Sequence, residues 1–376
     1  MRTAVTFVVT ALALGALLGG GGAGCGNDID PDTLVRELRV LAIRFGEPTA
    51  GSVAEVQATI DLSGAGGMPD LVFSQPQIQL KVLAVAPTGP GRRVTTPGPR
   101  PLQYDWFACL GRLSLFSPGT LDPDCRKFAP GDPAPRQNPV LKPLVAMPST
   151  SADLTLETAN LKETLGAFLQ VLLAPGSGGT GSGGTVTLPT RPITLLLPVL
   201  VQVSVVGGDP MNPLDSEVAY SFLRILVALP GMTLPPPNRN PSLPVAGGVQ
   251  VSGEEMGAMT QLVPCADAQS GDCPRYAASR TAPLFVTASA QAGSVETYTP
   301  LDDSGRTDLL ESMRYSWFST DGIFDDARTG DQHPQTQWKN DDSRPAAPET
   351  QVVDLWLVVQ DERGGADFQR FQLSLP

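Results

Sequence analysis

Apolar and polar residues alternate one by one in many segments of this chain, and that alternation limits what the chain can fold into. In VAEVQATIDL, every second position from Ala54 to Leu62 is Ala, Val, Ile or Leu, and Glu, Gln, Thr and Asp lie between them. Successive side chains of a β-strand point to opposite faces, so this period of two predicts a strand with one buried face. Similar segments begin at Ile78, Leu102, Leu197, Phe222, Leu284, Met313, Val352 and Phe368.

Turn-forming residues separate these segments. The 376 residues include 39 glycines and 37 prolines, which favour turns and leave room for few long helices. Short strands bounded by regular turn signals are typical of antiparallel β-sandwiches. We therefore expect an all-β fold, and the length favours two or three domains.

One short motif occurs twice, as YDWF at residues 104–107 and as YSWF at residues 315–318. A strong strand pair follows each copy, and in the second copy Gly364 and Gly365 lie in the turn of the pair. Between the copies lies LPPPNRNPSLP, in which three successive prolines stiffen the chain as a polyproline-type linker. We expect a domain boundary near residues 235–241.

The second copy resembles bacterial immunoglobulin-like and PKD-like modules through YSWFSTDGIF, TQWKNDDSRPAAPE and LWLVVQDERGG. The first copy is similar through RVLAIRFGEP, YDWF and its last two strands, and the whole chain resembles large lipoproteins of myxobacteria-like genomes. The resemblance implies two immunoglobulin-like antiparallel β-sandwich domains in tandem, acting as an extracytoplasmic scaffold or binding module. Fold analogy alone names no ligand.

The predicted domain organisation has five parts. They are a lipoprotein signal peptide at 1–24, an N-terminal tether at 25–33, an Ig-like domain at 34–232, a Pro-rich linker at 233–241, and an Ig-like or PKD-like domain at 242–376. The first domain carries an insertion at about 108–191. Long loops on rigid scaffolds often bind partners, so we expect any partner to contact this insertion.

Part of the insertion has helical spacing, with Leu161, Leu165, Phe168 and Leu172 at intervals of three and four residues. We favour a short helix that packs on the sandwich, and a helix that binds a partner is the alternative. The Gly-Ser run at residues 176–184 is most simply a flexible loop.

The N-terminus has the pattern of an export signal. Arg2 precedes the apolar run AVTFVVTALALGALL, which is short for a membrane-spanning helix. Gly22-Ala23-Gly24-Cys25 resembles a lipobox, although Gly22 stands where leucine is usual. This favours lipidation of Cys25 over an ordinary secretory signal. Because Gly26 follows instead of aspartate, we expect attachment to the outer membrane.

The cysteines support the export interpretation. Five cysteines are present, and an odd number in an exported chain requires a partner or another role for one of them. With Cys25 lipidated, Cys109–Cys125 and Cys265–Cys273 form two local pairs, which we expect to be disulfides in an oxidising compartment. A zinc site is the alternative, but the spacing is not CxxC.

The net charge of −12 limits the partners. An acidic surface repels phosphate backbones and anionic headgroups, so we expect no nucleic acid partner and a membrane contact only through lipidated Cys25. Other envelope proteins or glycans are the expected partners.

No catalytic constellation is evident. The match GSGGTG is followed by a strand instead of a helix, so it does not predict a phosphate site. The only histidine, His333, lies in the polar stretch GDQHPQTQ, and any histidine-based triad would have to use it.

Clustered aspartates are a second metal candidate. Calcium takes six to eight oxygen ligands, and LDDSGRTD and TDGIFDDARTGD supply carboxylates. The candidates are Asp302, Asp303, Asp308, Asp321, Asp325 and Asp326. We favour solvated turn aspartates and expect no metal site and no cofactor, and a calcium site is the alternative.

The tryptophans separate into two groups. Trp106 and Trp317 lie on the apolar side of their strands, which favours core packing over stacking on a sugar. Trp356 alternates with Asp354, so we expect it to face outward as the better contact residue.

The favoured function is a non-enzymatic, lipid-anchored interaction or scaffold module. A carbohydrate-binding accessory or a hydrolase using loop carboxylates is the alternative.

Overall fold

The fold is that of a computed structural model. It describes residues 33–46, 52–61, 63, 70–89, 92–95, 98–109, 125, 138, 140–162, 165, 191–209, 212–254, 257–269, 273–300, 306–340 and 351–376. All of these residues belong to one compact unit, Asp32–Pro376. The predicted signal peptide, Cys25, most of the insertion and the Gly-Ser run lie outside the described residues.

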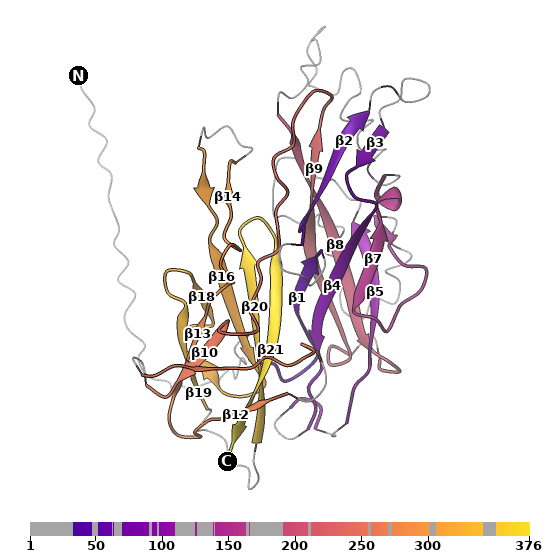
Figure 1. The fold of residues 1–376 in the computed structure, drawn as a ribbon. Coiled ribbons are helices and arrows are strands. Elements are labelled where there is room, and N and C mark those ends of the chain that lie inside the picture. The colour runs from indigo at the N-terminus through magenta and orange to yellow at the C-terminus, as the bar shows by residue number, and fades with distance from the viewer. Residues whose placement is uncertain are drawn as a thin grey trace, which may run out of the picture. The chain divides into compact units, whose positions relative to one another are not determined.

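The first sandwich pairs a six-stranded sheet with a three-stranded sheet (Figure 1). The six strands, in hydrogen-bonding order, are β3 (Asp70–Phe73), β2 (Glu55–Asp61), β9 (Ser216–Ala228), β8 (Ile193–Val205), β5 (Leu102–Cys109) and β6 (Leu141–Pro143). The other three are β1 (Arg39–Phe45), β4 (Gln77–Val85) and β7 (Asp153–Glu157). Only β2 and β9 pair in parallel among these strands.

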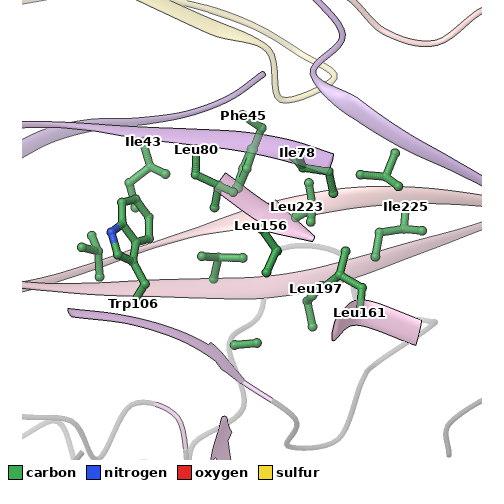
Figure 2. Packing of buried hydrophobic residues seen from close by; sticks show 14 of the residues in the cluster. Ile43, Phe45, Ile78, Leu80, Trp106, Leu156, Leu161, Leu197, Leu223 and Ile225 are labelled. Carbon is green, nitrogen blue, oxygen red and sulfur yellow. The ribbon is translucent and has the colours of Figure 1, made fainter. Parts of the chain in front are cut away.

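Alternating apolar side chains from both sheets form the first core. Trp106 on β5 and Leu80 on β4 are fully buried there. Figure 2 shows Trp106, Ile43 and Phe45 pointing into the space between the strands. Because each strand has a period of two, one face of each sheet supplies this core and the other face remains for other contacts.

The second sandwich has two five-stranded sheets. One contains β11 (Thr260–Gln261), β10 (Val249–Ser252), β13 (Leu284–Ala288), β19 (Gln335–Lys339) and β17 (Ile323–Phe324). The other contains β12 (Arg275–Ala277), β21 (Ala366–Leu375), β20 (Gln351–Asp361), β16 (Met313–Ser319) and β18 (Arg328–Gly330), with β12 parallel to β21. A small ribbon joins β14 (Thr297–Tyr298) and β15 (Leu309–Leu310).

Two tryptophans anchor the second core. Trp317 is fully buried and its indole N–H donates to the Thr329 hydroxyl over 3.1 Å. Trp338 is also fully buried and donates to the Asp321 carbonyl over 3.0 Å. The prediction that Trp106 and Trp317 pack in cores is therefore confirmed.

The predicted fold class is confirmed, because the described chain is nearly all β and forms immunoglobulin-like sandwiches with mainly antiparallel pairing. A short helical stretch covers residues 158–162 and 165. Its Leu161 and Leu165 are buried in the first core, so at these positions it packs on the sandwich. Phe168 and Leu172 lie outside the described residues.

Candidate functional site

The two sandwiches meet through a buried apolar cluster, which we call the junction core. It joins the faces of β1 and β4 opposite the first core to the faces of β20 and β21 opposite the second core. Its buried members are Val35, Ala42, Leu83, Val85, Trp356, Val358 and Phe368. These four strands are therefore buried on both faces, unlike the half-exposed strands of an isolated sandwich.

Trp356 corrects one sequence-based prediction. We expected it to face outward, but it is only 3% exposed and lies in the junction core. Its indole N–H donates to the Ala268 carbonyl over 3.0 Å. The face that alternation assigned to solvent is covered by the other sandwich, which is why the prediction was wrong.

A buried ion pair crosses the junction. Arg44 on β1 is 3% exposed, and its guanidinium lies 2.9 Å from the Asp367 carboxylate on β21 and 5.0 Å from the ring centroid of Phe368. Burial lowers the pKa of Arg44 and raises the pKa of Asp367, and their mutual attraction opposes both shifts. The second Asp367 oxygen accepts from the Leu243 N–H over 3.0 Å. Without β21 the buried Arg44 charge would lose this partner, and without β1 the same would hold for Asp367.

The loop between Cys265 and Cys273 also crosses the junction. The structure places these cysteines as a disulfide pair with Cα atoms 4.6 Å apart, as predicted. The Cys265 N–H donates to the Arg370 carbonyl over 2.8 Å, and the Gln269 side chain donates to the Val82 carbonyl on β4 over 2.7 Å. A loop closed in the second sandwich therefore holds a strand of the first.

The other cysteine pair lies on a different face. Cys109 and Cys125 form a disulfide pair with Cα atoms 6.1 Å apart, again as predicted. They are buried with Phe107, Leu141 and Leu200 on the face of the six-stranded sheet opposite the first core. Cys125 belongs to the insertion, so this pair attaches the insertion to that face.

Two asparagines in the predicted linker are buried. Asn238 donates to the Asp361 carboxylate over 3.2 Å. Asn240 donates to the Phe45 carbonyl and accepts from the Ala366 N–H, so it bonds to both sandwiches. Residues 233–241 are thus held at these points, while the predicted domain boundaries stay a prediction.

One pocket at the junction, the aromatic pocket, has a volume of about 520 Å³. Trp356, Tyr104 and Gln269 line it, and burial raises the pKa of Tyr104 to about 12. Its two arginines are engaged: Arg370 lies 2.8 Å from Asp354, and Arg100 is paired with Asp215. Each of these two ion pairs lies within one sandwich, whereas Gln269 bonds across the junction to the Val82 carbonyl.

A second pocket, the proline pocket, has a volume of about 390 Å³. Pro235–Pro237 form part of it, and residues 297–299 with Tyr298 face them from the β14 ribbon. The charged lining residues are Glu55, Arg224, Arg239, Glu296, Asp308 and Arg363. Both sandwiches contribute to this lining.

Glu55 is the least exposed charged group of the proline pocket, at 2%. Its Oε2 lies 2.9 Å from Arg224 Nε, whereas its Oε1 makes no hydrogen bond of normal geometry with the described residues. Burial raises the pKa of Glu55, and Arg224, Arg363, the Asn238 N–H and Gln57 partly oppose the shift. Glu55 is therefore a buried carboxylate at the edge of this pocket, and Arg224 is its main charged partner.

Further carboxylates are buried nearby. Glu311 is 3% exposed, lies 3.0 Å from Arg363, and has its pKa raised to about 7 mainly by burial and then by Asp361. Burial also raises the pKa of Asp361. Glu217 is half-buried near the start of β9 and does not line this pocket, and burial raises its pKa to about 7. The strand pattern gave no sign of these groups, because a polar residue in a strand normally points to solvent.

The calcium candidates in the described chain mostly have protein partners. Asp325 lies 2.9 Å from Lys339, Asp326 accepts from the Arg328 N–H, and buried Asp321 accepts from the Gly322 N–H. Among the residues that the structure describes, no group of three or more His, Cys, Asp or Glu could hold a metal ion. Asp308 lines the proline pocket, and Asp302 and Asp303 lie outside the described residues, so calcium stays a prediction.

His333 is exposed and lies at an open groove with Asp331 and Glu362. Asp331 is already engaged, since it accepts from the Tyr315 hydroxyl over 3.0 Å and from the Met313 N–H over 2.7 Å. Ser221 and Ser312 also line this groove, and the Ser312 hydroxyl lies 3.5 Å from the Glu362 carboxylate.

Comparison with known proteins adds little to this geometry. No protein-family model and no curated protein matches the chain. Among solved structures, cadherin-like domains 1 to 4 of zebrafish RET match at 10% identity and a TM-score of 0.12. The match covers 48% of this chain and 34% of the RET chain, about a third of its length. The sandwich assignment therefore rests on the strand pairing. No helix in the described part of the chain is long and apolar enough to cross a membrane.

Proposed function

We propose that this chain is a non-enzymatic interaction or scaffold module of the cell envelope, anchored through lipid on Cys25, in which the two sandwiches act as one rigid body. The junction core is the observation that supports this most. A flexible tandem would leave Trp356 and Phe368 in water, whereas here they are buried with residues of β1 and β4. A rigid body presents its outer surfaces at fixed spacing, which suits a scaffold.

The distribution of polar groups supports a binding role over catalysis. Arg44, Asp367, Asn238 and Asn240 hold the two sandwiches together, so these buried polar groups serve the structure. The partner surface is proposed to include the insertion at 108–191, which Cys109–Cys125 attaches to the six-stranded sheet.

Mass spectrometry of the N-terminal peptide tests the anchor. We expect the mature chain to begin at lipidated Cys25 and to fractionate with outer membranes. Because one acyl chain binds membranes only marginally, several chains are expected. The variant Cys25→Ser should appear in the soluble fraction. Membrane-associated protein with an unmodified N-terminal peptide would contradict the anchor.

Cross-linking in cells tests the scaffold. The intact protein should capture envelope partners, and deletion of residues 170–188 with a short Gly-Ser bridge should remove them. This deletion leaves β6, β7, Leu161 and Leu165 in place, so the remaining chain should stay folded. A truncated protein that folds and captures every partner would place the partner site elsewhere. Turnover of any substrate that is lost in Glu311→Gln with folding intact would favour the hydrolase alternative instead.

A further inference from the structure

The two disulfides differ in how far solvent reaches them. Cys109 and Cys125 are each only 1% exposed, whereas Cys265 and Cys273 are both half-buried and Ala266, beside Cys265, is exposed. Thiol–disulfide exchange requires a thiolate to reach a sulfur atom, so access decides which disulfide reacts first. The geometry therefore favours Cys265–Cys273 as the pair that an external thiol can attack.

The loop that this pair closes is bonded to both sandwiches. The Ala268 carbonyl accepts from the Trp356 indole on β20 of the second sandwich over 3.0 Å. The next residue, Gln269, donates to the Val82 carbonyl on β4 of the first sandwich over 2.7 Å. Ala268 also packs against the junction core. The loop is thus a link between the sandwiches, and one accessible disulfide closes it.

We propose that Cys265–Cys273 is a redox modification site that locks the junction, and that a partner presenting an exposed dithiol cleaves it. The proposal rests on the rigid-body function proposed above. It goes beyond that function, because it makes the rigidity of the junction depend on the oxidation state of one cysteine pair.

The exchange takes place in two steps. One thiolate of the partner attacks a sulfur of the pair, so that a mixed disulfide forms and the other cysteine leaves as a thiolate and takes up a proton. The second thiolate of the partner then attacks the mixed disulfide, which releases the remaining cysteine and leaves the partner as a disulfide. Two electrons and two protons pass from the dithiol to this chain, so the exchange is balanced.

Cleavage should loosen the junction. It opens a loop whose closing cysteines are 8 residues apart in sequence. The residues at 266–269 then regain backbone freedom, and single hydrogen bonds offset only part of that entropy. Trp356, now 3% exposed, would lose the acceptor of its indole N–H. Gln269 would leave the lining of the aromatic pocket, so water could enter there.

Reduction of the purified full chain by dithiothreitol, a small dithiol, tests the selectivity without denaturant. Alkylation of free thiols with iodoacetamide, followed by peptide mass spectrometry, follows each pair separately. We expect Cys265 and Cys273 to become alkylated at least about tenfold faster than Cys109 and Cys125. Equal rates for the two pairs, or faster reduction of Cys109–Cys125, would overturn the proposal.

Hydrogen exchange of the singly reduced chain tests whether the junction opens. Peptides from β4 and β20 should lose protection, while peptides from β8 in the first core should keep it. Selective reduction with unchanged protection in β4 and β20 would overturn the lock and leave the rigid-body function in place. Separate unfolding of the two sandwiches in the oxidised chain would overturn the rigid-body function, and the lock with it.

Two glutamine variants separate the lock from a general loss of stability. Gln269→Ala keeps the disulfide and removes the bond to Val82, and its half-buried position should let it fold. The control is Gln261→Ala, because exposed Gln261 donates to the Val245 carbonyl over 3.0 Å within the second sandwich. Gln269→Ala should raise exchange in β4 before any reduction, and Gln261→Ala should not. Equal exchange in the two variants would overturn the role of the loop as a lock.

Discussion

Two sheet faces of this protein carry aromatic side chains that end in opposite environments. On β20, Trp356 and its neighbours face the other sandwich, and Trp356 is 3% exposed. On β9, Tyr220 and Phe222 form an edge-to-face pair with centroids 5.8 Å apart, and Tyr220 stays 46% exposed. Both faces lie opposite a core. The difference shows that the partner surface, and not the strand itself, decides burial.

The largest expected effect comes from removing the junction tryptophan. Trp356→Ala should destabilise the protein by about 3–5 kcal/mol, because it leaves a cavity and an unpaired Ala268 carbonyl. Tyr220→Ala should cost less than about 1 kcal/mol, since most of that side chain is already in water. Urea unfolding of both variants measures the contrast, and equal losses would contradict it.

The ion pair across the junction gives the next largest effect. Asp367→Ala should cost about 3 kcal/mol or more, because it leaves the Arg44 charge buried without its partner. The exposed pair of Lys339 and Asp325, also 2.9 Å apart, is the control, and Asp325→Ala should cost about 0–1 kcal/mol. The double variant Arg44→Met with Asp367→Leu should recover much of the loss. A failure to recover would show that the site needs the charges themselves.

The two disulfides sharpen the comparison further. Chain entropy alone predicts about 3 kcal/mol for each and slightly more for Cys109–Cys125, which closes the longer loop. The junction account predicts the opposite ranking. Losing Cys265–Cys273 also frees Ala268 and Gln269, which bond across the junction. Unfolding of the two double Cys→Ser variants measures which disulfide contributes more stability. A larger loss for Cys109–Cys125 would argue against the idea that the Cys265–Cys273 loop holds the junction together.

The smallest expected effect depends on pH. The pKa of Glu311 is raised to about 7 in the folded protein, above its ordinary value in the unfolded chain. The folded state therefore binds more protons between about pH 4.5 and 7, and stability falls as the pH rises through that range. Glu217 acts in the same direction.

Glu311→Gln should flatten this dependence, so that the variant loses less stability than the native chain between pH 5 and pH 8. Unfolding at both pH values measures the difference, and Asp325→Asn, at an exposed position, is the control. A variant with the same pH slope as the native chain would show that Glu311 is not the group responsible.

Much of the fold could be predicted from the sequence. Alternation located β2, β4, β5, β8, β9, β13, β16, β20 and β21, because a strand with one buried face leaves a period of two in the chain. Both cysteine pairs followed from their local spacing. The helical spacing of Leu161 and Leu165 also corresponds to burial in the core.

The junction could not be predicted with the same rules. Its signal is continuous apolar sequence, as in VLAV at residues 82–85 and LWLVV at residues 355–359, where both strand faces are apolar. That pattern indicates that both faces of the strand are buried, but it does not identify the residues that cover the second face. Arg44 and Glu55 stand at positions where a strand usually shows polar residues to solvent, and only distant residues such as Asp367 and Arg224 make them buried pairs.

The central claim is that the junction joins the two sandwiches into one cooperative unit. Native-state hydrogen exchange in increasing denaturant, read by mass spectrometry, measures this directly in peptides from β8 of the first sandwich and β16 of the second. We predict that both peptides lose protection at the same denaturant concentration in the native chain, and that Trp356→Ala separates them. Two distinct transitions in the native chain would contradict the claim.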